Sequence, residues 1–213
     1  MTTRMVSRSL PLALVVGLAL VTGCERPKEL RVPLDYRPTD RMKLGGLDVV
    51  PGVRLAVSVV DARADTAAIG QNAEGSPPVP IYAGGPSPDV FVRDGVAREL
   101  ANAGIPVESD PHAANKGLTL RLQRFWTDET STYKTSILAS AELTDASGRS
   151  LWRGQVTGNN KRFGRSLKAE NYQETLSDAV VDLVQNMLHD PAFGQALNAP
   201  PARAPAVRKS GRG

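Results

Sequence analysis

The apolar and polar positions of the chain follow two different periods, and each period predicts one kind of element. Apolar residues alternate with polar ones through residues 118–126 and 133–143, as expected for strands with one buried and one exposed face. A turn at residues 145–148 leads into a return strand, which predicts an antiparallel meander. The predicted strands are residues 53–60, 105–107, 118–126, 133–143 and 151–156.

The strand predicted at residues 53–60 differs from the others because, toward its end, apolar residues occupy both odd and even positions and so point to both faces. A strand of that kind is usually covered on both faces, so we predict a central position in the sheet for it. Residues 65–86, which follow it, collect many glycines and prolines. This segment is predicted to form a long loop.

Two segments show the period of a helix. In the first, Ser87 is placed as an N-cap, Pro88 as the first helical residue and Asp89 as an acid in the first turn. Apolar residues then recur at helical spacing until Gly104, which predicts a helix over 88–103. The second segment carries one apolar stripe, formed by Tyr172, Leu176, Ala179, Val180, Leu183, Val184, Met187 and Leu188.

Asn171 and Glu174 resemble a capping box at the start of this last helix, and Pro191 marks its end. The predicted order of elements is therefore β-α-β-β-β-β-α. Together they predict an α+β fold, a two-layer sandwich in which a mainly antiparallel sheet carries both amphipathic helices on one face.

The N-terminal segment has the pattern of an export signal. Arg4 and Arg8 precede residues 10–21, which contain no charged or amide side chain. This apolar run is shorter than the roughly 20 residues that a membrane-spanning helix needs. The segment is therefore interpreted as a signal peptide.

The apolar run ends in Val21-Thr22-Gly23-Cys24, which resembles the lipobox of bacterial lipoproteins. The resemblance implies a diacylglycerol on Cys24, cleavage before Cys24 and acylation of the new amino terminus. The alternative is a secretory signal that ends near a buried or disulfide-bonded cysteine. The chain has a single Cys, so an intramolecular disulfide is impossible. Glu25 follows where an Asp would imply retention in the inner membrane, which implies sorting to the outer membrane, on its periplasmic face.

The chain is predicted to divide into a signal peptide (1–23), a lipidated N-terminus and tether (24–46), one α+β domain (47–198) and a disordered basic tail (199–213). Of the formal net charge of +4, two positive charges leave with the signal peptide and four belong to the tail, so the part between them carries −2. Neither a basic stripe nor an aromatic stacking motif is evident there, and nucleic acid is not expected as a partner.

The sequence predicts no catalytic, cofactor-binding or metal-ligating residue. Cys24 is the only residue to which it assigns a role, as the site of lipidation. Asp110 and His112 are adjacent in a turn and fit an Asx-type loop better than a triad. His189 falls at the C-terminus of the last helix, where a capping role is expected. Trp126 and Trp152 could stack on a glycan or lipid, but packing beneath the helices is favoured for both.

Several segments together resemble the YajG-like family of bacterial outer-membrane lipoproteins. They are the lipobox, the 55–63 strand ending in Val-Val-Asp-Ala-Arg63, Ile69-Gly70, Ala103-Gly104, the 118–125 strand, the hairpin from Ala141 to Trp152 and the last helix. The resemblance implies the fold and the anchor. It implies no activity, because the family has no established catalytic or binding residues.

Three functions are compatible with these patterns. The first is a non-catalytic binding or scaffolding module that is tethered in the cell envelope through acyl chains on Cys24 and acts on an envelope protein, glycan or lipid. The second is an auxiliary lipoprotein of a lipid-transport or cell-wall synthesis machine, which predicts a groove or an apolar patch on the open sheet face. The third is an envelope hydrolase, which would depend on Asp110 and His112.

Overall fold

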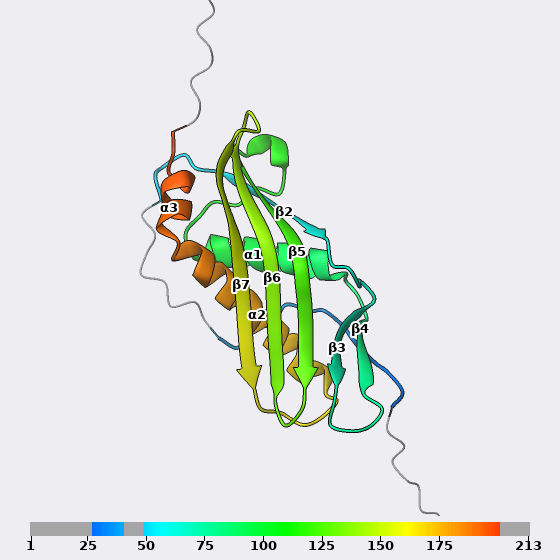
Figure 1. Cartoon of the computed structure of the whole chain (residues 1–213). Helices are drawn as coiled ribbons and strands as arrows, with labels where there is room; N and C mark the ends of the chain where they lie inside the picture. The colour runs from blue at the N-terminus through cyan, green and yellow to red at the C-terminus, as the bar shows by residue number, and fades with distance from the viewer. Residues whose placement is uncertain (1–26, 41–48, 201–213) are drawn as a thin grey trace, which may run out of the picture.

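A computed structural model describes residues 27–40 and 49–200, which form a seven-stranded sheet with helices on one face (Figure 1). The strands are β1 (Leu30–Val32), β2 (Leu55–Asp61), β3 (Ala68–Asn72), β4 (Val79–Ala83), β5 (Lys116–Glu129), β6 (Tyr133–Asp145) and β7 (Ser150–Arg162). The helices are α1 (Pro88–Asn102), α2 (Ala169–Leu188) and α3 (Pro191–Leu197), and a short 3-10 turn spans Pro111–Ala113. The predicted α+β sandwich, with both long helices behind one mainly antiparallel sheet, is confirmed.

Strand β5 organises the sheet because it has two partners on one side. The first half of β5 pairs with β2 and its last residues pair with β3, both in parallel. On its other side β5 forms the antiparallel meander β5–β6–β7 that the alternating pattern predicts. Strand β4 continues the sheet beyond β3, and β1 closes it in parallel with β4.

A β-bulge in β5 reverses which residues face the helices. The pairing register shifts between Leu122 and Arg124, so Leu118, Leu120 and Leu122 point inward before the bulge. After it, the buried positions move to Phe125, Thr127 and Glu129. One inserted residue exchanges the two faces of a strand because side chains alternate with a period of two.

The core lies between the sheet and the helices, and α2 covers β6 and β7 while α1 packs behind β2. Phe91 of α1 makes an edge-to-face contact with Phe125, and Trp152 makes one with Phe193 of α3. Trp152 is 8% exposed and donates a hydrogen bond from Nε1 to Asp190 Oδ2 at 2.9 Å. Packing beneath the helices is therefore confirmed for Trp152.

Helix α2 and β7 approach each other closely at Gly158. A Cβ atom on this residue would lie 2.0 Å from the carbonyl oxygen of Ala179 and 2.7 Å from Cβ of Leu183. Only glycine fits there without moving the helix. Gly70 has the same role between β3 and β5, where a Cβ would lie 2.3 Å from the carbonyl oxygen of Thr127.

The segment predicted as a tether contributes to the fold. Strand β1 lies within it, and the chain after β1 crosses the helices, where Leu34 is buried and the ring of Tyr36 contacts Phe91. The Asp178 carboxylate accepts hydrogen bonds from the backbone N–H of Thr39 and from its hydroxyl, each at 2.6 Å. A tether over 24–46 is therefore wrong for residues 30–40, because the three residues of β1 pair with a strand 51 residues further along the chain.

The strands of the N-terminal half differ from prediction. Strand β2 is not central: among the described residues its only strand partner is β5, and Val60 is 45% exposed. The predicted long loop at 65–86 contains β3 and β4. The predicted strand at 105–107 is reduced to one bridge between Leu55 and Val107.

Local signals placed the helices well but misjudged their caps. Helix α1 starts after Ser87 as predicted, although the Ser87 side chain makes no capping hydrogen bond, and Gly104 has the expected positive φ of 85°. The capping box is wrong, since α2 begins after Lys168 and Asn171 lies inside it. Helix α2 ends at Leu188, shortly before Pro191 as predicted, and Pro191 then starts the short helix α3 with Asp190 as its N-cap.

Candidate binding surface on the uncovered face of the sheet

The face of β5, β6 and β7 that points away from the helices is uncovered by any described element (Figure 1). Paired residues of neighbouring strands project to the same side, so the register defines the composition of this face. Its basic residues are Arg121, Arg124, Lys134, Arg153 and Lys161, and its acidic residues are Asp128 and Glu142. The face therefore carries an excess of three positive charges.

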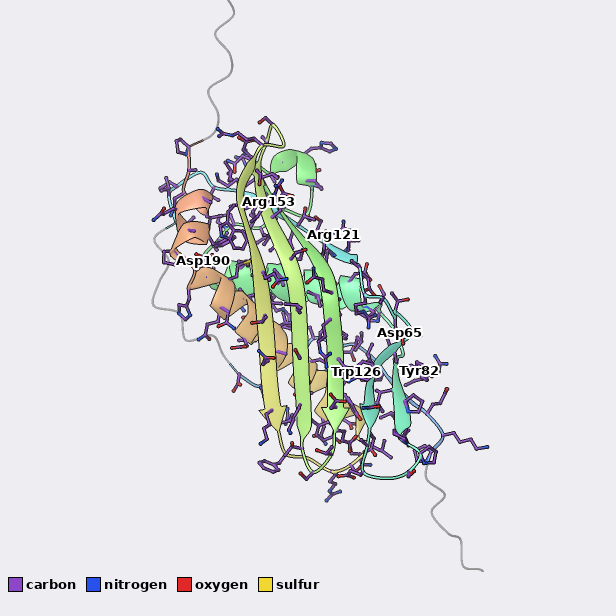
Figure 2. The ribbon with its side chains drawn as sticks, viewed as in Figure 1. Asp65, Tyr82, Arg121, Trp126, Arg153 and Asp190 are labelled. Carbon is purple, nitrogen blue, oxygen red and sulfur yellow. The ribbon has the colours of Figure 1, made fainter. Side chains whose placement is uncertain are left out.

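This concentration of charge corrects one expectation from the sequence. The body of the chain was predicted to have no basic stripe, because its charges are balanced along the sequence. Arg121 and Arg153 lie 32 positions apart in the chain, yet Figure 2 shows them near each other on the upper half of the sheet. Strand pairing brings them onto one surface.

The upper half of this surface contains a shallow depression of about 340 Å³ that extends across β5, β6 and β7, here called the central patch. It is lined by Thr119, Arg121, Ser140, Ala141, Glu142, Arg153 and Gly154. Arg153 donates hydrogen bonds to Glu142 Oε1 from Nε at 2.9 Å and from Nη2 at 2.7 Å, and these hydrogen bonds hold the pKa of Glu142 below its usual value. Among the described residues, the Arg121 guanidinium has no ion-pair partner, so it is the cation of the patch that can receive an anionic group.

Trp126 lies lower on the same face (Figure 2) and is half-buried. Its Nε1 donates a hydrogen bond to Asp128 Oδ1 at 2.9 Å, and the Gln71 side chain donates to the same oxygen at 3.0 Å. The prediction that Trp126 packs beneath the helices is wrong, because the β5 bulge turns Phe125 inward in its place. The indole is thus available beside the basic residues.

A buried carboxylate organises the lower end of the sheet. Glu129 is 1% exposed and accepts hydrogen bonds from the Tyr172 hydroxyl at 2.5 Å and from the backbone N–H of Leu167 at 2.9 Å. Burial alone would raise the pKa of Glu129, but hydrogen bonds from Ser166, Tyr172 and Asn72 outweigh it and hold the pKa below its usual value. These side chains and the Leu167 N–H together supply four hydrogen bonds to the carboxylate, which indicates a structural role.

The residues of the Val-Val-Asp-Ala-Arg63 segment also have a structural role. The Arg63 guanidinium is buried, pairs with Asp61 at 2.8 Å and donates to the carbonyl oxygens of Thr66 and Ala68. These contacts close the connection from β2 to β3. Desolvation acts against the charge of Asp61, and the hydrogen bonds from Arg63 lower its pKa overall.

The candidate residues named from the sequence are not brought together into a reactive site. Cys24, the predicted lipidation site, and the basic residues of the predicted tail lie outside the described residues. The Asx-type turn is confirmed, since Asp110 Oδ1 accepts a hydrogen bond from the backbone N–H of His112 at 2.9 Å. His189 is the C-cap residue of α2, as predicted.

The described part of the chain comprises residues 27–40 and 49–200. No group of three or more His, Cys, Asp and Glu side chains in this part of the chain is arranged to hold a metal ion. None of its helices combines the length and apolarity needed to cross a bilayer.

The fold is a small two-layer α+β domain with an uncovered polar sheet face. A family model described as an uncharacterised lipoprotein matches residues 48–198, and the chain belongs to this family of lipoproteins. Membership confirms the resemblance drawn from the sequence and associates the chain with the cell envelope. No curated protein matches the chain.

Solved structures give more distant likenesses. A Xanthomonas campestris protein of the DUF330 family is 16% identical, with a TM-score of 0.51 over 78% of this chain and 95% of that protein. The PelC dodecamer protein of Paraburkholderia phytofirmans is 18% identical, with a TM-score of 0.44 over 72% and 92%. A minor lipoprotein of Acinetobacter baumannii is 9% identical, with a TM-score of 0.39 over 67% and 94%. The Xanthomonas structure shares the fold.

Proposed function

We propose that the protein is a non-catalytic, membrane-anchored binding or scaffolding module of the cell envelope, and that it binds its partner through the uncovered sheet face. The observation that carries this proposal is the composition of that face: five basic residues against two acidic ones, with Arg121 unpaired among the described residues and Trp126 beside them. Such a surface fits an acidic partner that offers carboxylates or phosphates.

The proposal includes the anchor predicted from the sequence. Acyl chains on Cys24 would hold the domain on the periplasmic face of the outer membrane, and no cofactor or metal is required. Membership of a lipoprotein family supports the anchor. Intact-mass measurement of the mature protein from its native host tests it directly, since the mass either includes the lipid on residue 24 or does not.

The shape of the central patch supports binding rather than catalysis. Its charged lining is exposed and shallow, whereas acyl-transfer sites need a base, a nucleophile and donors converging in a pocket that excludes water. The Asp110 carboxylate, which the hydrolase hypothesis required, accepts a hydrogen bond from the backbone of its own turn. The lipid-transport alternative predicted a groove or an apolar patch on this face. The side chains in the row of Arg121 are polar, whereas the accessible surface of the depression itself is mainly apolar.

A photo-crosslinking experiment in cells tests the binding surface. A crosslinking residue at Gln155, which lies exposed on the row of Ser140 and Arg121, is expected to form a discrete adduct with an envelope component. The matched control is Ala101, which is exposed on α1 behind the sheet and is expected to form none.

Reversal of the charge at Arg121 provides a second test of the same crosslinking experiment. The Arg121→Glu substitution should reduce the Gln155 adduct by about tenfold or more, since like charges at an interface oppose binding and every 1.4 kcal/mol is tenfold in affinity. The proposal fails if the two positions give the same adducts, or if the Gln155 adduct is indifferent to Arg121→Glu.

A further inference from the structure

The lower end of the domain combines an exposed aromatic side chain with unpaired basic residues. Phe163, directly after β7, is 78% exposed, which makes it the most exposed large apolar residue in the described chain. Lys161, Arg165 and Lys168 flank it, all are exposed, and none has an ion-pair partner among the described residues. An aromatic ring surrounded by cations is typical of proteins that bind the headgroup region of anionic bilayers.

The protein holds this segment in place instead of leaving it free to fold inward. The carbonyl oxygen of Arg165 accepts hydrogen bonds from the Tyr133 hydroxyl at 2.5 Å and from Asn171 Nδ2 at 2.9 Å. Leu167 donates its backbone N–H to buried Glu129 and has a φ of 53°, a conformation that is unfavourable for a residue with a side chain. These hydrogen bonds therefore fix a loop that presents Phe163 to the outside.

The register places the start of the described chain at the same end. Leu30 pairs with Ile81, which pairs with Gly70, and Gly70 pairs with Thr127. Thr127 pairs with Thr135, and Thr135 pairs with Asn160. Leu30 therefore lies in the same row across the sheet as Asn160, which precedes Phe163 by three residues. Figure 1 shows the first described residues leaving at this lower end, whereas α3 and the C-terminal residues lie at the upper end.

The anchor would keep this end close to the bilayer. Cys24 precedes Leu30 by six residues, which reach at most about 20 Å when fully extended. A lipid on Cys24 therefore confines the lower end to the membrane surface at a high effective concentration, so weak contacts suffice to dock it.

We infer that the loop around Phe163 is a membrane-docking element: Phe163 enters the headgroup region of the bilayer that holds the lipid anchor, and Lys161, Arg165 and Lys168 contact anionic headgroups. This inference rests on the proposed acylation of Cys24. It orients the domain with its strands rising from the membrane. The row of Arg121 and Ser140 then stands seven residues above Tyr133, on the order of 23 Å up the sheet, within reach of an envelope partner.

Fluorescence quenching with the full lipidated protein tests this orientation. Because Cys24 would be acylated, a cysteine introduced at Ser131 or Ala146 is the only free thiol and takes a fluorophore selectively. Both residues are exposed at turns, Ser131 between β5 and β6 at the lower end and Ala146 between β6 and β7 at the upper end. They are matched probes at the two ends of strand β6.

The labelled protein is reconstituted in vesicles of phosphatidylcholine and phosphatidylglycerol that contain a lipid with a spin-labelled acyl chain. We expect strong quenching at Ser131 and little at Ala146. Phe163→Ser should reduce quenching at Ser131 while leaving the fold intact, since the side chain is exposed. Equal quenching at the two positions, or no effect of Phe163→Ser, would overturn the inference.

The contribution of charge is tested with two triple variants. Replacing Lys161, Arg165 and Lys168 by Gln should lower the docking equilibrium constant on anionic vesicles by about fivefold per residue and remove the difference from phosphatidylcholine alone. Replacing Arg121, Arg124 and Arg153 by Gln removes the same charge from the uncovered face and should leave quenching unchanged. If this second variant abolishes docking instead, the uncovered face is the membrane surface and the inference is wrong.

Intact-mass measurement of the same preparations separates the possible failures. A protein with lipid on Cys24 but no quenching at Ser131 contradicts the docking element and leaves the binding proposal standing. A protein without lipid contradicts the anchor on which the docking element rests.

Discussion

The two faces of strands β5, β6 and β7 are built from neighbouring residues but are subject to different constraints. On the covered face most side chains are buried and apolar, and at Gly158 the helix leaves no room for a Cβ atom. On the uncovered face charged residues stand one row apart and at least one cation has no ion-pair partner among the described residues. Stability is concentrated on the first face, which leaves the second free to carry a binding surface.

The sharpest test of this contrast uses the two tryptophans. Trp152→Ala removes a ring that is 8% exposed, packed on Phe193 and bonded to Asp190, and we expect a loss of about 4 kcal/mol of unfolding free energy. Trp126→Ala on the uncovered face should cost about 1 kcal/mol. Urea denaturation measures both, and equal losses would contradict the assignment of the two faces.

Neighbouring residues of β7 give the next comparison. Gly158→Ala places a methyl group 2.0 Å from the carbonyl oxygen of Ala179, and displacing α2 should cost about 3 kcal/mol. Thr157→Ala, one residue earlier and on the uncovered face, should change stability by less than about 0.5 kcal/mol. Denaturation midpoints of the two variants decide the matter, and a tolerated Gly158→Ala would refute the close approach.

Two glutamates test the cost of burying charge. Glu129→Ala leaves the Tyr172 hydroxyl and the Leu167 N–H buried without an acceptor, and we expect a loss of about 2 to 3 kcal/mol. Glu142→Ala breaks an ion pair on the uncovered face, where solvent replaces the contact, and should leave the unfolding midpoint nearly unchanged. The same variant should nevertheless alter crosslinking from Gln155, because it changes the charge of the central patch.

The smallest effect concerns acid stability at the turn after β6. Hydrogen bonds from Ser147 and Arg149 lower the pKa of Asp145 from 3.8 to about 2. Because the pKa is lower in the folded state, the ionised carboxylate stabilises the protein above about pH 4, and this contribution disappears as the pH falls toward 2. Asp145→Asn should flatten the stability profile between these values, and an unchanged slope would show that the turn does not contribute.

The accuracy of the sequence predictions depends on how locally each feature is determined. The helix at Pro88 and the meander from residue 118 to 156 were located from periods and turn residues that act over a few positions. The short strands β1, β3 and β4 were missed because their three to five residues carry too little pattern, and Pro80 lies within one of them. Their strand identity comes from partners elsewhere in the chain.

The candidate site shows the same division. The sequence contained Arg121 and Arg153 but could not show that they share a face, and extending the alternation past Leu122 assigned Trp126 to the wrong side. The capping box at Asn171 failed because that side chain is needed to hold the carbonyl oxygen of Arg165, a contact between the last helix and the loop before it.

The sequence by itself determined the class of fold, the family resemblance and the prediction of an anchor at Cys24, because amphipathic periods, turn residues and the lipobox are local signals read along the chain. Only the tertiary structure decided which strand is central, which face of the sheet is basic and which end presents Phe163. These features depend on strand pairing and on one inserted residue in β5, and pairing partners far apart in the chain leave no local signal.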